Sequence, residues 1–227
     1  MPRAAEEGQP RLSRRLRAGV AELRLHGQDR FLRETALGLF GVFDGVGQFS
    51  GSGEAAETAA SLVLEACRSA GEVGPEPLVS GCQRAHAAII AADTGATTAT
   101  TVWIDRDRAA YASVGDSRLY QQTAGLALPR QVTVDEGEGR FLDNALGVGG
   151  VGASSPVARQ SGWLTIAAGD KLVLVTDGIT GDYPPDLLSP GELGEAIAGD
   201  DPELAAKRLV EIARKHDDRT AVVVFLD

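Results

Sequence analysis

The sequence predicts an α+β fold with antiparallel sheet, because segments typical of helices and of strands follow one another in blocks. Two helix-like segments stand together between residues 54 and 89, and three strand-like segments follow between residues 97 and 121. A doubly wound fold would alternate strand and helix instead. The 227 residues, 43% of them hydrophobic, suit one domain with a core of ordinary size.

Composition excludes several classes of protein. A net charge of −10 argues against nucleic acid or an anionic membrane as partner, and no apolar run approaches the length of a membrane span. Cys67 and Cys82 lie in helix-like segments without metal-ligand spacing, which indicates reduced packing residues. The three histidines are scattered (positions 26, 86 and 216), which argues against a zinc site. We therefore expect a cytoplasmic protein.

The amino-terminal part of the chain divides at residue 17. Residues 1–17 are polar and basic and predict a loosely held arm; they carry five arginines but no apolar stretch, unlike a signal peptide. Residues 18–227 are expected to form the domain. It begins with an edge strand over residues 18–25, a loop over 26–30, a short strand at 31–32 and a buried strand over 37–43.

The spacing of apolar residues along the chain predicts the remaining helices and strands. Apolar residues at helical spacing predict helices over 54–69 and 78–89. Strands are expected over 97–104, 109–114 and 118–121, with a turn at 105–108 and an acidic loop over 125–139. Strands 163–166 and 171–176 are expected to pair across the turn at 168–170. Asp201 and Pro202 predict a helix start, and the helix is expected to run to about Lys215 before a last strand over 221–226.

Four acidic motifs lie at the ends of predicted strands: Asp44-Gly45, Gly115-Asp116, Asp177-Gly178 and Asp217-Asp218. Strand ends on one side of a sheet system can meet in one cleft, where several carboxylates repel one another unless cations separate them. Oxygen ligands without His or Cys favour Mg²⁺ or Mn²⁺, and two such ions suit displacement at phosphorus. Spacing alone leaves open the alternative of four independent turns.

Five motifs in order resemble the PPM (type 2C) family of metal-dependent serine/threonine protein phosphatases in its compact bacterial form. They are Phe43–Gly47 (FDGVG), Tyr111–Arg118 (YASVGDSR), Asn144–Gly147 (NALG), Leu172–Ile179 (LVLVTDGI) and Asp217–Val224 (DDRTAVVV), and the resemblance covers roughly residues 18–227. It implies a four-layer αββα sandwich of two antiparallel β-sheets flanked by helices.

The resemblance also implies a metal site. Asp44 would bridge two Mn²⁺ or Mg²⁺ ions and the Gly45 carbonyl oxygen would bind one of them. Asp177 and Asp217 would complete the ligands of the first ion, so that Asp44, Asp177 and Asp217 are the catalytic residues. Asp116 matches the acid that helps hold a third, weaker ion.

Two further residues match family positions outside the strand-end motifs. Asp29 matches an early acid that orders metal-bound water, and Arg24 matches the arginine that grips the substrate phosphate; an arginine suits a phosphate dianion. The implied reaction is attack by a metal-bridging water on phosphoserine or phosphothreonine, without a phosphoenzyme. Its partners would be phosphoprotein substrates of a Ser/Thr kinase, and the protein would be a monomer.

The chain departs from the family pattern at several positions. Val46 stands where many relatives carry a histidine that protonates the leaving alcohol, so a slower leaving-group step is expected. Gln28 replaces a glutamate and Asp218 an asparagine, while Gly181, followed by Asp182, stands where relatives carry a further acid. The stretch over residues 129–144 is short compared with the flap beside the cleft in many relatives.

Two alternatives to an active kinase-counteracting phosphatase remain open. Val46, Gln28 and Gly181 also fit a phosphatase-like binding or regulatory module that has lost efficient catalysis. A third reading is a phosphatase of regulatory phosphoproteins in a sigma-factor partner switch, a role that a sensor domain normally accompanies.

Overall fold

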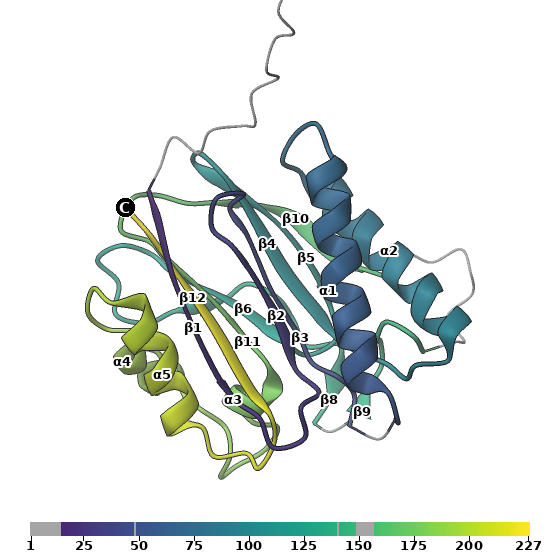
Figure 1. Ribbon diagram of the computed structural model, residues 1–227. Coiled ribbons are helices and arrows are strands. Elements are labelled where there is room, and N and C mark those ends of the chain that lie inside the picture. Colours follow the sequence, from purple (N-terminus) through teal and green to yellow (C-terminus); the bar gives the residue numbers. More distant parts are fainter. Residues whose placement is uncertain (1–14, 48, 140, 149–156) are drawn as a thin grey trace, which may run out of the picture.

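The computed structural model describes residues 15–47, 49–139, 141–148 and 157–227 (Figure 1). Two five-stranded antiparallel sheets stack on each other, and helices cover both outer faces. This is the four-layer αββα sandwich that the motif resemblance implied, and it confirms the α+β class. Most of the expected arm, residues 1–14, lies outside the described residues.

The first sheet, here sheet A, has the strand order β1-β12-β11-β6-β7. Its strands are β1 (Leu16–Leu23), β6 (Arg118–Gln122), β7 (Arg130–Gln131), β11 (Lys171–Val175) and β12 (Arg219–Leu226). The edge strand β1 begins two residues before the expected boundary and pairs along its whole length with β12. The first and last described segments of the chain therefore lie side by side.

The second sheet, sheet B, has the order β10-β5-β4-β3-β2. Its strands are β2 (Arg30–Glu34), β3 (Leu39–Phe43), β4 (Ala99–Asp105), β5 (Arg108–Val114) and β10 (Gln160–Thr165). All five residues of β3 are buried, as its continuous apolar sequence predicts. A small separate hairpin, β8 (Gly137–Glu138) and β9 (Phe141–Leu142), stands apart from both sheets.

Helices α1 (Ser52–Ser69) and α2 (Pro75–Ala92) cover sheet B, while α4 (Pro190–Ala196) and α5 (Pro202–Ile212) cover sheet A (Figure 1). One further short turn of helix, α3 (Asp177–Thr180), follows β11 directly. Within the described part of the chain, every helix is too short or too polar to cross a membrane. The helix α4 was not predicted, although its capping box of Ser189 and Glu192 is a readable signal.

Three apolar layers hold the sandwich together. One lies between α1, α2 and sheet B, one between the two sheets, and one between sheet A and the helices α4 and α5. The layer between the sheets includes Val42 and Val102 from sheet B and Leu174 and Val222 from sheet A. Burial of this apolar surface is the main favourable term that fixes the two sheets relative to each other.

Two expectations about local structure are wrong. The strands near residues 163–166 and 171–176 do not pair with each other: β10 pairs with β5 in sheet B, and β11 lies between β12 and β6 in sheet A. The turn between them carries the chain from one sheet to the other. The helix expected to reach Lys215 ends at Ile212, so Lys215 belongs to the loop before β12.

Candidate active site

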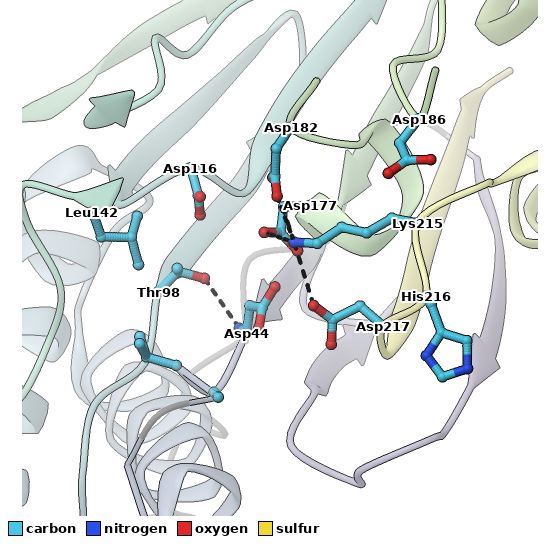
Figure 2. A pocket seen from close by; sticks show the side chains of 13 residues that line it. Asp44, Thr98, Asp116, Leu142, Asp177, Asp182, Asp186, Lys215, His216 and Asp217 are labelled. Carbon is cyan, nitrogen blue, oxygen red and sulfur yellow. Dashed lines mark hydrogen bonds and ion pairs between the residues drawn. The ribbon is translucent and has the colours of Figure 1, made fainter. Parts of the chain in front are cut away.

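Four predicted aspartates meet at one end of the sandwich. Asp44 directly follows β3, Asp116 follows β5, Asp177 follows β11, and Asp217 precedes β12. They share a cavity of about 390 Å³ (Figure 2), which is lined by Asp44, Gly45, Val46, Gly47, Thr98, Asp116, Leu142, Asp177, Asp182, Asp186, Lys215, His216 and Asp217. The alternative of four independent turns is therefore wrong for their placement.

The backbone of Asp44 is held from both sides by two threonines. Its N–H donates to Thr98 Oγ1 at 3.0 Å, and its carbonyl oxygen accepts from Thr98 N at 2.8 Å and from Thr97 Oγ1 at 2.9 Å. At the next residue, a Cβ on Gly45 would lie 2.8 Å from the backbone of Ser52. Glycine is needed here because α1 approaches the strand end too closely for any side chain.

The cavity concentrates negative charge on carboxylates that are partly or fully buried. Burial raises the pKa of Asp44 well above its usual value, and the nearby charges of Asp29, Asp177, Asp116 and Asp217 raise it further. Burial, together with the charge of Asp177, raises the pKa of Asp116 to about 7. Without a cation, these carboxylates are costly to ionise together, so the cavity favours positively charged ligands.

Asp29 is not among the residues that line this cavity and is almost fully buried, with 2% of its surface exposed. Its Oδ2 accepts hydrogen bonds from Thr176 Oγ1 at 2.9 Å and Thr220 Oγ1 at 2.8 Å. Burial raises its pKa to about 7. Its Oδ1 is buried and has no hydrogen-bond partner among the described residues. An acceptor left open in this way is available to a water molecule or a cation.

Asp218 anchors the loop that carries Asp29. Its Oδ1 accepts from the backbone N–H groups of Leu25 and His26 at 2.5 and 2.7 Å, and its Oδ2 accepts from those of Gln28 and Asp29 at 2.5 and 3.4 Å. Burial favours the neutral acid, but these N–H groups outweigh it and lower the pKa of Asp218. These contacts explain why aspartate stands here instead of asparagine: a carboxylate accepts hydrogen bonds on two oxygens, whereas an amide has only one.

Lys215 is a charged residue of the cavity that the motifs did not reveal. Its ammonium forms an ion pair with Asp177 and lies 3.3 Å from Asp182 Oδ2 and 3.3 Å from Asp217 Oδ2 (Figure 2). Burial lowers its pKa, but the three carboxylates more than compensate and raise it, so the side chain is charged. No sequence pattern marked this lysine.

Arg24 is not brought to the cavity. Its side chain is 57% exposed, and its guanidinium pairs with Glu22 at 3.1 Å on the protein surface. Val46 does line the cavity, as its place after Asp44 predicts. His216 lines it too, but Figure 2 shows the imidazole ring turned away from the carboxylates. Asp182 reaches Lys215, whereas Gly181 turns the chain behind α3.

Residues 129–139 and 141–144, the described part of this short stretch, form a wall beside the cavity. Arg118 binds Asp135 through two guanidinium nitrogens at 2.6 to 3.0 Å, which holds the start of this wall. Glu136 Oε2 accepts from the backbone of Gly115 at 2.9 Å and from Asn144 Nδ2 at 2.8 Å, which holds its base. Leu142, at the end of β9, contributes an apolar side chain to the cavity lining.

The donor set suits a hard divalent cation. Carboxylates from Asp44, Asp177 and Asp217, the open Oδ1 of Asp29 and the carbonyl oxygen of Gly45 are the oxygen ligands that Mg²⁺ and Mn²⁺ prefer. Among the described residues, no three carboxylate, histidine or cysteine side chains have the arrangement of a formed metal site in this conformation. The ammonium of Lys215 lies between two of these ligands.

Comparison with known families supports the resemblance. Residues 41–226 match the family model described as Stage II sporulation protein E (SpoIIE). A comparison with curated protein sequences found no match.

Solved structures share the fold. They include the PPM Ser-Thr phosphatase MsPP from Mycobacterium smegmatis (22% identity, TM-score 0.75, 93% of this chain and 98% of that one). The catalytic domain of the serine threonine protein phosphatase PstP, in complex with 2 manganese ions, has 22% identity and a TM-score of 0.69 over 93% and 98% of the chains. RsbX in complex with magnesium has 18% identity and a TM-score of 0.69 over 95% and 96%.

Proposed function

The chain belongs to the SpoIIE family, within the PPM (type 2C) class in its bacterial form, and on that premise we propose that it is a Mg²⁺- or Mn²⁺-dependent phosphatase of phosphoserine and phosphothreonine in proteins. One observation carries this proposal: Asp44, Asp116, Asp177 and Asp217 come from four separate strand ends and line one cavity. The metal complexes of PstP and RsbX support divalent ions as the cofactors.

In this proposal the carboxylates of Asp44, Asp177 and Asp217 and the carbonyl oxygen of Gly45 hold the metal, and Asp116 contributes to a weaker third ion. When bound, the divalent ions supply the Lewis acidity that makes water nucleophilic at neutral pH and offset charge at phosphorus. Asp29 orients water through its open Oδ1. Because the Arg24 side chain is exposed and pairs with Glu22, its contact with the phosphate requires this side chain to leave Glu22 and turn toward the cavity.

A covalent mechanism through cysteine finds no support in the described residues. Cys67 in α1 and Cys82 in α2 are buried and lie outside the lining of the cavity. Burial raises the pKa of each thiol to about 12, so both are protonated at neutral pH. A thiol in this state is a poor nucleophile.

The experiment that tests this function measures phosphate release from a phosphothreonine peptide with MnCl₂ and with EDTA. We expect turnover only with the metal, and a loss of roughly a hundredfold or more in Asp177→Asn, because a ligand is removed. The matched control is Asp107→Asn on the exposed turn after β4, which should keep full activity. Absence of metal-dependent turnover in folded protein would reject the proposal.

A second candidate is a phosphatase-like module that binds phosphoproteins without efficient hydrolysis. It is favoured by Val46 at the place of a proton donor and by the Lys215 ammonium among the carboxylates. Calorimetry with the phosphopeptide and with its unphosphorylated form separates the two. Tight, phosphate-dependent binding with no release of phosphate would favour the binding module.

A further inference from the structure

The position of Lys215 distinguishes it from the other lysines of the chain. It stands in the loop between α5 and β12, and only 16% of its side chain is exposed. Lys207, on the exposed face of α5, and Lys171, at the start of β11, both lie outside the cavity lining. A lysine that is mostly buried is rare unless several opposite charges surround it.

Three carboxylates surround the ammonium. Asp177 begins α3 and Asp182 follows it, while Asp217 stands two residues after Lys215 in the same loop, so carboxylates from two segments of the chain meet at one nitrogen atom. Figure 2 shows the lysine side chain extended toward Asp177, with the carboxylates of Asp182 and Asp217 on either side.

Two of these three carboxylates are the proposed ligands of the first metal ion. An ammonium group and a divalent ion cannot occupy the same space. If both were held by the same two carboxylates, their positive charges would repel each other strongly at that short distance. The carboxylate oxygens of Asp177 and Asp217 that face Lys215 are therefore shared between alternative cations.

We propose that Lys215 determines the metal affinity of this site, because its ammonium occupies the place between Asp177 and Asp217 and has to be displaced when a divalent ion binds. The inference rests on the proposed function, since it assumes that these two aspartates bind Mn²⁺ or Mg²⁺. The lysine supplies positive charge to the acidic cavity while no ion is bound. The same contact raises the ion concentration that is needed to load the site.

The test measures Mn²⁺ binding by isothermal titration calorimetry in the wild type, Lys215→Met, Lys215→Arg and Lys207→Met. We expect Lys215→Met to bind Mn²⁺ about tenfold more tightly or better, an effect within reach of one ion pair at an effective dielectric constant of about 20. Lys215→Arg keeps the cation and should not show this gain. Lys207→Met removes the same charge from an exposed face and should change the dissociation constant less than about twofold.

A second measurement covers the case in which Lys215→Met folds poorly. In EDTA this variant should unfold at lower urea concentration than Lys207→Met, because three carboxylates lose their counter-ion. In MnCl₂ the difference between the two unfolding midpoints should become smaller. If Lys215→Met does not fold without metal, Lys215→Gln, which still hydrogen-bonds to carboxylates, takes its place in the titration. An unchanged or weaker affinity for Mn²⁺ in the neutral variants would overturn the inference.

The outcomes separate this inference from the proposed function. Wild-type protein that hydrolyses the phosphopeptide, with no gain of Mn²⁺ affinity in Lys215→Met, keeps the function and rejects the role of Lys215. A gain of affinity in protein without turnover supports the role of Lys215 and rejects the phosphatase. Failure of the wild type and of every variant to bind Mn²⁺ rejects both.

Discussion

Replacing Asp218 by asparagine tests whether its carboxylate holds the loop after β1. The wild-type side chain accepts four backbone N–H groups, two on each oxygen. Asparagine has nearly the same shape and is the residue that the family resemblance leads one to expect at this position. Its amide group, however, accepts on one side only and presents N–H donors on the other.

The size of the effect follows from the hydrogen bonds that are lost. Whichever way the amide turns, two backbone N–H groups face a donor instead of an acceptor, and the other two lose a charged partner. A hydrogen bond to a charged group contributes about 1.5–3 kcal/mol, so two lost bonds amount to about 3 kcal/mol or more. For a chain of 227 residues, this corresponds to a decrease in Tm of about 6 to 12 °C.

Urea denaturation followed by circular dichroism measures this difference in EDTA and in MnCl₂. Asp107→Asn, an exposed aspartate in the turn between β4 and β5, is the matched control and should change the free energy of unfolding by less than about 0.5 kcal/mol. A loss below about 1 kcal/mol in Asp218→Asn would refute the reasoning, because it would mean that water satisfies the loop equally well.

Three further predictions concern the same end of the sandwich. The pKa of Asp29 and of Asp116 is raised to about 7, so the folded metal-free protein binds more protons than the unfolded chain between about pH 4 and 7. Its stability in EDTA should therefore fall from pH 5.5 to pH 8 in urea denaturation, and a rise would contradict this. Gly178→Ala would place a Cβ 1.8 Å from the carbonyl oxygen of Asp218, so thermal unfolding should show a loss of about 3 kcal/mol or more, while Gly71→Ala, with open space around it, changes little. Val46→His should increase kcat for a phosphoserine peptide by about tenfold or more and leave aryl phosphates, whose leaving group needs no proton, unchanged; an equal increase on both substrates would exclude proton donation.

Much of the architecture was predictable because the signals are local. The apolar run before Asp44 predicts a buried strand, the helical period of residues 54–69 and 78–89 predicts α1 and α2, and the glycine at position 45 predicts a tight turn. The prediction that β10 and β11 form a hairpin was wrong because strand pairing is not local. Alternation along a strand indicates which side chains face the core but not which neighbouring strand supplies the hydrogen bonds.

The sequence by itself therefore determined the α+β class of this protein and the acids that end its strands, since each depends on residues close together in the chain, whereas the four layers were implied by the resemblance of five motifs to a known family. The tertiary structure alone decided what surrounds those acids. Lys215 lies among three carboxylates, Asp218 binds the N–H groups of a loop about 190 residues earlier, and Arg24 pairs with Glu22 away from the cavity. The contacts of Lys215 with Asp177 and of Asp218 with the loop depend on where distant segments meet after the two sheets pack together, and no local pattern encodes that. Arg24 and Glu22 are only two residues apart, but that their pair lies away from the cavity is also decided by the tertiary structure.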